Sequence, residues 1–279
     1  MDELELSGGM MGGAVRVGDT VRKTSKPQSR TVQRLLAHVR AQGVTWVPEP
    51  LGTDERGRDV WSFIAGEVPH DQPEWLWSRD ILTTVAARLR EWHEATATFE
   101  RRPEDVWWWP GKRPAEVICH VDFAPYNHVF RDRRFVGAID FDICYPAPRL
   151  WDLAYTAYRY VPLTPHVSDA VEDGDSWCRT RFTPAEVEER LQAFLDAYAG
   201  SDARFRYAAP ALLGHVLPRL LSVAQWCEHQ PDELLRRNAV MYRAHIRWLH
   251  SGARGPIQPV EVGDPLLSVC SPDPSRAPQ

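Results

Sequence analysis

The residues best suited to chemistry lie between positions 120 and 142. His120, Asp122 and Asn127 follow a short apolar run in the pattern H-x-D-x-x-x-x-N, and Asp140 comes thirteen residues after Asn127. A carboxylate such as Asp122 can accept the proton of an attacking hydroxyl group. The oxygens of Asn127 and Asp140 are the hard ligands that magnesium prefers. This set could therefore activate a hydroxyl group beside a magnesium-bound substrate.

The order and spacing of these residues resemble the catalytic loop of kinases followed by its metal-binding aspartate. In phosphoryl transfer, charge collects on the γ-phosphate oxygens, so catalysis depends on positioning and on neutralising that charge. Asp122 would then meet the attacking hydroxyl group, and His120 would be a structural hydrogen-bonding residue. Asp142 is a further metal-ligand candidate, although a solvated turn or a helix cap explains it equally well.

Short strands must position this set. Val117–Cys119 is an apolar run that leads into His120, and a hairpin is expected from Val129-Phe130, a charged turn at 131–134, and Phe135–Ile139. Asn127 and Asp140 stand on either side of that hairpin. Because the hairpin is short, both side chains can face one cavity.

The first 67 residues predict a small unit rich in strands. Ala14–Val17 and Thr20–Lys23 alternate apolar and polar residues around a Gly18-Asp19 turn, and Val60–Ile64 is a further expected strand. One helix is expected from Val32 to about Gly43. Helical spacing dominates later, over 78–97, 150–160, 183–198, 209–230 and 232–250. The pattern predicts an α+β protein.

The chain resembles a known family in three segments, which are His120–Asn127, Ala138–Asp142 and Pro148–Ala154. They are similar to the aminoglycoside phosphotransferase and choline kinase-like family, and within it to the trifolitoxin-immunity-like members. The resemblance implies a bilobal protein-kinase-like fold with a small β-rich N-lobe and a larger, mostly helical C-lobe. The expected parts are a nucleotide-binding N-lobe and hinge at 1–67, a helical C-lobe at 68–250, and a proline-rich tail at 251–279.

The resemblance also implies roles for individual residues. Asp122 would be the catalytic base, and Asn127 and Asp140 would bind magnesium. Asp152 would be a buried residue that braces the catalytic loop, and Asp142 matches a second, less uniform acidic position. The implied reaction is ATP-dependent and magnesium-dependent transfer of the γ-phosphate to a hydroxyl group of a small molecule, which could be an antibiotic.

The nucleotide side is less specific in sequence. The segment Ser7–Gly13 could lie over the phosphates, although it is not G-x-G-x-x-G. Lys23 fits the cation that meets the ATP phosphates, and Arg22 is the alternative. Residues 62–65 would form the interlobe hinge, where backbone groups of Phe63 and Ala65 would meet adenine.

Two departures from the family pattern stand out. Kinases pair the phosphate-binding lysine with a helix glutamate, but the helix here offers Gln33 and no acidic residue between Ser29 and Gln42. The lysine–glutamate pair is therefore in question. Val121 stands where glycine is usual in the family, and we expect its side chain to point away from the metal.

Composition bounds the partners. The net charge of −5 argues against a nucleic-acid binder, and no apolar run is long enough to span a membrane. An acidic start without a signal-peptide pattern and five scattered cysteines favour a cytoplasmic protein. The acidic stretch Asp169–Asp175 could attract a cationic acceptor, although a solvated loop explains it as well.

Two other functions fit parts of the pattern. A metal-dependent hydrolase would use His120, Asp122, Asp140 and Asp142 as ligands, but it would leave Asn127 without a purpose. A non-catalytic binding or immunity protein would need only the scaffold. The complete set of Asp122, Asn127 and Asp140 argues against it.

Overall fold

The computed structural model describes residues 3–6, 13–164 and 182–251. The chain divides into two compact units, Met1–Asp152 and Leu153–Gln279. The lobe boundary expected between residues 67 and 68 stays a prediction. The loop expected at 7–13 (apart from residue 13), the acidic stretch 169–175 and the tail after residue 251 lie outside the described residues.

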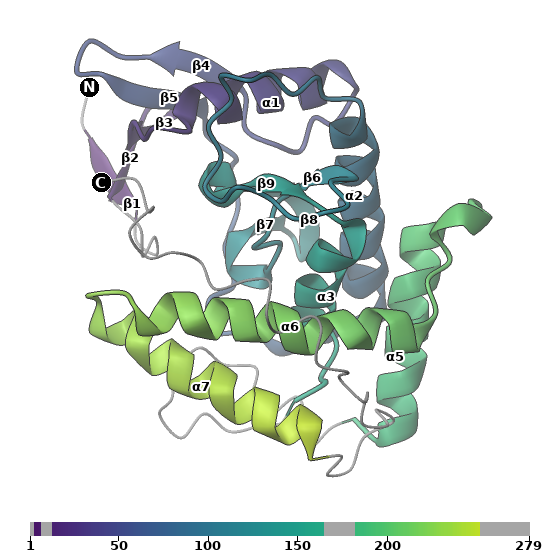
Figure 1. Cartoon of the computed structure of the whole chain (residues 1–279). Coiled ribbons are helices and arrows are strands. Elements are labelled where there is room, and N and C mark those ends of the chain that lie inside the picture. Colours follow the sequence, from purple (N-terminus) through teal and green to yellow (C-terminus); the bar gives the residue numbers. More distant parts are fainter. Residues whose placement is uncertain (1–2, 7–12, 165–181, 252–279) are drawn as a thin grey trace. The chain divides into compact units, whose positions relative to one another are not determined.

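The first unit opens with a five-stranded antiparallel sheet (Figure 1). Its strands, in spatial order, are β1 (Leu4–Leu6), β2 (Ala14–Val17), β3 (Thr20–Thr24), β5 (Arg58–Ser62) and β4 (Pro50–Thr53). The predicted β2–β3 hairpin is confirmed, with Gly18 at a positive φ of 59° in the turn. The strand expected at 60–64 is present but lies two residues earlier, since β5 runs from Arg58 to Ser62.

Helix α1 (Ser29–Ala41) follows the hairpin and buries the apolar face that the sequence predicted. Helix α2 (Arg79–Ala97) is capped by Ser78, whose side chain accepts a hydrogen bond from the Ile81 amide at 3.3 Å. Its buried Trp92 donates from Nε1 to the Ile118 carbonyl at 2.8 Å. That bond ties α2 to strand β6 (Val117–Cys119), which precedes the candidate site.

Four short strands frame the chemical segment. Strand β6 pairs with β9 (Tyr145–Ala147), and β7 (His128–Arg131) pairs with β8 (Arg134–Ala138). The predicted hairpin is therefore confirmed. Two 3₁₀ turns connect these strands to the loops, at Pro125–Asn127 and Phe141–Ile143.

Helix α3 (Arg149–Tyr160) runs from the first unit into the second. The second unit continues with α5 (Pro184–Ala199), α6 (Ala209–Glu228) and α7 (Glu233–His250), and α6 packs along α7 (Figure 1). A capping box begins α5, where the Thr183 side chain accepts from the Glu186 amide and the Glu186 side chain accepts from the Thr183 amide. Pro218 lies inside α6. Among the helices that the structure describes, none is both long and apolar enough to cross a membrane.

Candidate active site

All the predicted site residues lie in the first unit, Met1–Asp152. The loop that begins at His120 rests on Asp152, which is fully buried in the first turn of α3. Its carboxylate accepts hydrogen bonds from the backbone amides of His120 and Val121, each at 2.8 Å, and from His93 Nε2 at 3.2 Å. The structure thus places Asp152 beneath the loop, in the position that a brace requires.

Burial and hydrogen bonding act in opposite directions on Asp152. Burial alone would raise the pKa of the carboxyl group, but the bonds from His93 and the His120 amide outweigh it, so the pKa lies below its usual value. The pKa of His93 is lowered, chiefly because its ring is buried. Asp152 therefore remains ionised near neutral pH and keeps both of its oxygens as acceptors.

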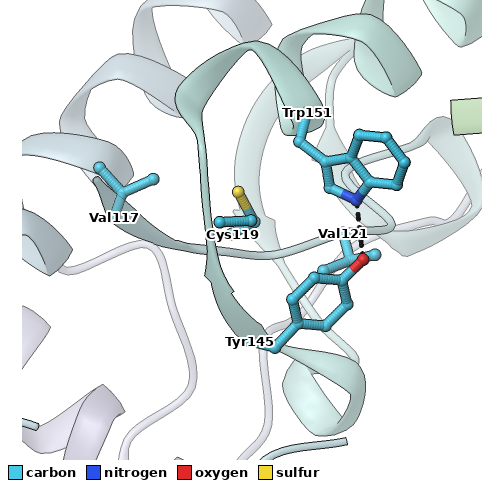
Figure 2. Packing of buried hydrophobic residues seen from close by; sticks show 6 residues of the cluster. Val117, Cys119, Val121, Tyr145 and Trp151 are labelled. Atoms are coloured by element: carbon cyan, nitrogen blue, oxygen red, sulfur yellow. Dashed lines mark hydrogen bonds between the residues drawn. The ribbon is translucent and has the colours of Figure 1, made fainter. Parts of the chain in front are cut away.

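Val121 takes a left-handed backbone conformation, with φ of 75°. A β-branched residue there costs about 1–3 kcal/mol. Its side chain is buried in an apolar cluster with Val117, Cys119, Tyr145, Ala147 and Trp151 (Figure 2). Trp151 donates from its indole nitrogen to the Tyr145 hydroxyl at 2.7 Å, which fixes one side of that cluster.

His120 links the loop to the residue that follows strand β8. Its Nδ1 accepts from the Asp122 amide at 3.3 Å, and its Nε2 lies 3.1 Å from the Ile139 carbonyl, which makes Nε2 the protonated nitrogen. Both ring nitrogens thus have protein partners. His120 is placed as a structural residue, and the ligand role that a hydrolase would give it has no free ring nitrogen.

Two donors hold the Asp122 carboxylate. Tyr126 donates from its hydroxyl to Oδ1 at 2.5 Å, and Asn127 donates from Nδ2 to Oδ2 at 2.8 Å and to the Asp122 carbonyl at 3.0 Å. These two bonds of Nδ2 set the orientation of the Asn127 amide, whose oxygen is then available as a ligand atom. Sequence reasoning missed Tyr126, although it lies inside the same motif.

Asp140 joins this group through the backbone. The Ile139 amide donates to the Asn127 carbonyl at 2.8 Å, so Asp140 follows a residue bonded to Asn127. Asp140 itself has φ of 65° and ψ of 58°, the left-handed conformation that aspartate tolerates better than most residues. Asn127 thus contacts Asp122 directly, and the backbone bond brings the residue before Asp140 to Asn127. A shared magnesium site of Asn127 and Asp140 stays a prediction.

The predicted phosphate-binding cation reaches the same place. Lys23 Nζ lies 2.7 Å from Asp140 Oδ1 and 2.8 Å from Asp142 Oδ2, and Lys26 Nζ lies 3.1 Å from Asp142 Oδ2. Burial acts to lower the pKa of Lys23, but the two aspartates outweigh it and raise the pKa. For Asp142, burial acts to raise the pKa, and the two lysines outweigh it and lower the pKa. Lys23 and Asp142 are therefore both charged near neutral pH.

Arg22 is directed elsewhere. Its guanidinium group contacts the Thr20 hydroxyl, and its Nε lies 3.6 Å from Asp54 Oδ2. Of the two cations that the sequence offered, Lys23 contacts the aspartates of the candidate site. This follows from the alternation of side chains along a strand.

The hinge residues already have partners within the protein. The Phe63 amide donates to the Asp19 carbonyl at 2.9 Å, and the Ala65 carbonyl accepts from Arg131 Nη2 at 2.8 Å. Adenine contacts at Phe63 and Ala65 stay a prediction. They would use the Phe63 carbonyl and the Ala65 amide, or they would displace Arg131.

The donor set fits magnesium. Carboxylate and amide oxygens come from Asp140 and Asn127, and the Lys23 ammonium group on Asp140 shows that this position attracts a cation. A second group of ligand types, His93, Cys119 and Asp152, has its atoms within 4.8 Å of one another in the core. We assign no metal there, because Asp152 accepts three N–H bonds and the Cys119 thiol lies 3.4 Å from the Pro148 carbonyl.

Known proteins resemble this chain in sequence. Residues 71–190 match the model of the phosphotransferase enzyme family. The Trifolitoxin immunity protein of Rhizobium leguminosarum bv. trifolii is 38% identical over 164 residues, which cover 56% of this chain. The chain spans 61% of the length of that curated relative. The resemblance that the motifs predicted is confirmed.

Solved structures resemble it in fold. A choline/ethanolamine kinase family protein from Mesorhizobium loti superimposes with a TM-score of 0.54 at 18% identity, over 89% of this chain and 87% of that one. An ethanolamine kinase from Plasmodium vivax gives a TM-score of 0.59 at 12% identity, over 88% and 82%. Identities this low bear on the fold alone. The predicted α+β, bilobal kinase-like fold is confirmed.

Proposed function

We propose that this chain, whose residues 71–190 match the phosphotransferase enzyme family, transfers the γ-phosphate of ATP to a hydroxyl group of a small molecule. The observation that carries the proposal is the arrangement around Asp122. Its carboxylate is held by Tyr126 and Asn127, and Asp140 follows Ile139, whose amide donates to the Asn127 carbonyl. Fold likeness alone would not specify this chemistry.

Asp122 is the base in this reaction. The acceptor hydroxyl group donates its proton to the carboxylate as its oxygen forms a bond to the γ-phosphorus, and the bond from that phosphorus to the β,γ-bridging oxygen breaks to leave ADP. Tyr126 and Asn127 keep the carboxylate in one orientation through this change. Such fixed geometry removes the entropy of orienting the base, which can contribute several kcal/mol to catalysis.

Asn127 and Asp140 would hold magnesium, which neutralises phosphate charge when it is bound. Lys23 would contact the α- and β-phosphates. Its ammonium group lies 2.7 Å from Asp140 Oδ1 and 2.8 Å from Asp142 Oδ2. Lys23 would therefore exchange Asp140 for phosphate oxygens when ATP binds.

The acceptor belongs to a class that the immunity relative suggests. That relative is named for immunity to trifolitoxin, so we propose that the acceptor is a hydroxyl-bearing compound such as an antibiotic. Its phosphorylation would confer resistance. A cytoplasmic location fits this role and stays a prediction.

The test is phosphoryl transfer with and without Asp122. Purified protein is incubated with ATP, magnesium and a panel of aminoglycosides, other antibiotics, amino alcohols, sugars and nucleosides. ADP release is measured and each hit is checked by mass spectrometry for an added phosphoryl group. We expect Asp122→Asn to lower kcat by about 10²–10⁴-fold, the usual contribution of a general base. Asp132→Asn, in the exposed turn between β7 and β8, is the matched control and should keep full activity.

The same pair of variants separates catalysis from sequestration. If the chain protects cells from a compound, Asp122→Asn should abolish protection and Asp132→Asn should retain it. Full protection by Asp122→Asn, with no phosphorylated product, would show instead that the protein binds and sequesters the compound.

A further inference from the structure

The phosphate-binding lysine lacks its usual partner. Helix α1 (Ser29–Ala41) contains no aspartate or glutamate. Gln33, which faces the sheet from this helix, donates from Nε2 to Asp59 Oδ1 at 3.0 Å. Asp59 also accepts from the hydroxyls of Ser25 and Ser29. The start of α1 is therefore bound to Asp59, and no acidic group of α1 is present to fix Lys23.

Lys23 is held instead by carboxylates more than a hundred residues later in the chain. The two are not equivalent. Asp140 adjoins Asn127 through the Ile139 amide, and its side chain is 38% exposed. The Asp142 side chain is 19% exposed, and Asp142 is the middle residue of the 3₁₀ turn Phe141–Ile143. Asp140 is thus the more open of the two to an entering cation.

Asp142 is itself fixed by the segment between β3 and α1. Lys26 Nζ lies 3.1 Å from its Oδ2, and Gln28 donates from Nε2 to its backbone carbonyl at 3.0 Å. The Lys26 amide in turn donates to the Ser29 hydroxyl at 2.8 Å, which binds this segment to the start of α1. One carboxylate oxygen of Asp142, Oδ2, therefore contacts the ammonium groups of both Lys23 and Lys26. The Asp142 backbone is held as well, by Gln28.

We infer that Asp142 is the positioning residue of Lys23 and takes the role that a helix glutamate has in other kinases, and that Asp140 rather than Asp142 binds the metal. The inference rests on the proposed function, since Lys23 is the group that would contact the ATP phosphates. When a metal and phosphates occupy Asp140, Asp142 remains as the carboxylate that keeps the long lysine side chain in place. Without it, Lys23 regains rotamer freedom that phosphate binding must then remove.

Whether the loss of Asp142 weakens or strengthens ADP binding distinguishes a positioning role from a simple charge effect. Asp142 is an anion beside a phosphate site, so removing its charge should by itself strengthen ADP binding. Loss of a positioning contact should weaken it. We expect Asp142→Asn to weaken metal-free ADP binding about tenfold, in the middle of the range for interacting neighbours.

The experiment measures two bindings on the full chain. Fluorescent ADP is titrated in EDTA, and Mn(II) is titrated by electron paramagnetic resonance in the presence of ADP. Asp142→Asn should lose about tenfold in ADP affinity and keep Mn(II) affinity within threefold of the wild type. Asp140→Asn should lose Mn(II) binding. Lys23→Met combined with Asp142→Asn should bind ADP no more weakly than Lys23→Met alone, because both changes remove one interaction.

A second variant guards against misfolding of the first. Asp142→Glu keeps the charge but displaces the carboxylate, so it too should weaken ADP binding, whereas a pure charge effect predicts no change. Unchanged or tighter ADP binding by Asp142→Asn and Asp142→Glu, or loss of Mn(II) binding equal to that of Asp140→Asn, would overturn the inference alone. A wild-type protein that binds neither ADP nor Mn(II) would overturn the proposed function beneath it.

Discussion

At the scale of single residues, Val121 is where the sequence conflicts most with the backbone. Its positive φ disfavours valine, and its side chain nevertheless fills an apolar cluster between β6, β9 and α3 (Figure 2). Burial of a valine side chain contributes about 1.5–3 kcal/mol, which is similar to the cost of the backbone conformation. The two effects nearly cancel, so valine is tolerated where glycine would relax the backbone.

This balance predicts the outcome of two glycine substitutions. Val117→Gly, in β6 of the same cluster, removes the same atoms from extended backbone and should cost about 3 kcal/mol. Val121→Gly also relieves the left-handed strain and should cost about 1–3 kcal/mol less. Urea denaturation of both variants measures the difference. Equal losses in the two variants would mean that Val121 stores no strain.

Residue identities in the motif could be predicted from sequence, but their partners in space could not. The spacing of Asp122, Asn127 and Asp140 specified a local loop and hairpin, and the structure bonds Asn127 to Asp122 and to the residue before Asp140. The contacts of Lys23 with Asp140 and Asp142 join residues more than a hundred positions apart. Only the packing of the folded chain decides such contacts. The bond from Tyr126 to Asp122 was local, yet a tyrosine alone does not signal it.

At the scale of elements, Asp152 connects the first turn of α3 to the loop at His120 and Val121. Asp152→Asn keeps the shape but replaces one acceptor oxygen by an NH₂ group that faces N–H donors of the protein. We expect a loss of about 3 kcal/mol at pH 7, because the group is buried. Urea denaturation gives the value, with Asp132→Asn as the exposed control.

The stability lost in Asp152→Asn should depend on pH. The pKa of Asp152 is lower in the folded chain than in the unfolded chain, where it is about 3.9. Its carboxylate therefore contributes stability that is complete above about pH 5 and is lost as the pH falls through the folded value. The stability difference between wild type and Asp152→Asn should be constant from pH 8 to about 5 and shrink below about pH 4. A difference that grows on acidification would contradict this assignment.

Elements with strong patterns were predicted, and those without were missed. The periodicity of α1, α2 and α5 to α7 and the alternation in β2 and β3 each report one buried face. The missed strands are β1, β4 and β9. β4 reads Pro-Leu-Gly-Thr and β9 reads Tyr-Pro-Ala, which contain the residues that normally argue against a strand. Both lie at sheet edges, where proline needs no ladder partner.

At the scale of the whole molecule, the proposed function predicts that nucleotide and metal stabilise the chain together. A ligand at a hundred times its Kd adds about 2.7 kcal/mol to the free energy of unfolding, and each kcal/mol shifts the Tm of a domain of this size by about 2–4 °C. Magnesium with ADP should therefore raise Tm by about 5–10 °C, and magnesium alone should raise it by less than about 2 °C. Because Asp140 is the proposed ligand, Asp140→Asn should lose most of the joint shift, whereas Asp132→Asn should keep it.

Stabilisation by zinc or manganese without nucleotide, and none by ADP, would favour the metal-dependent hydrolase. The buried ring of His120, whose nitrogens are bonded to the Asp122 amide and the Ile139 carbonyl, argues against that outcome.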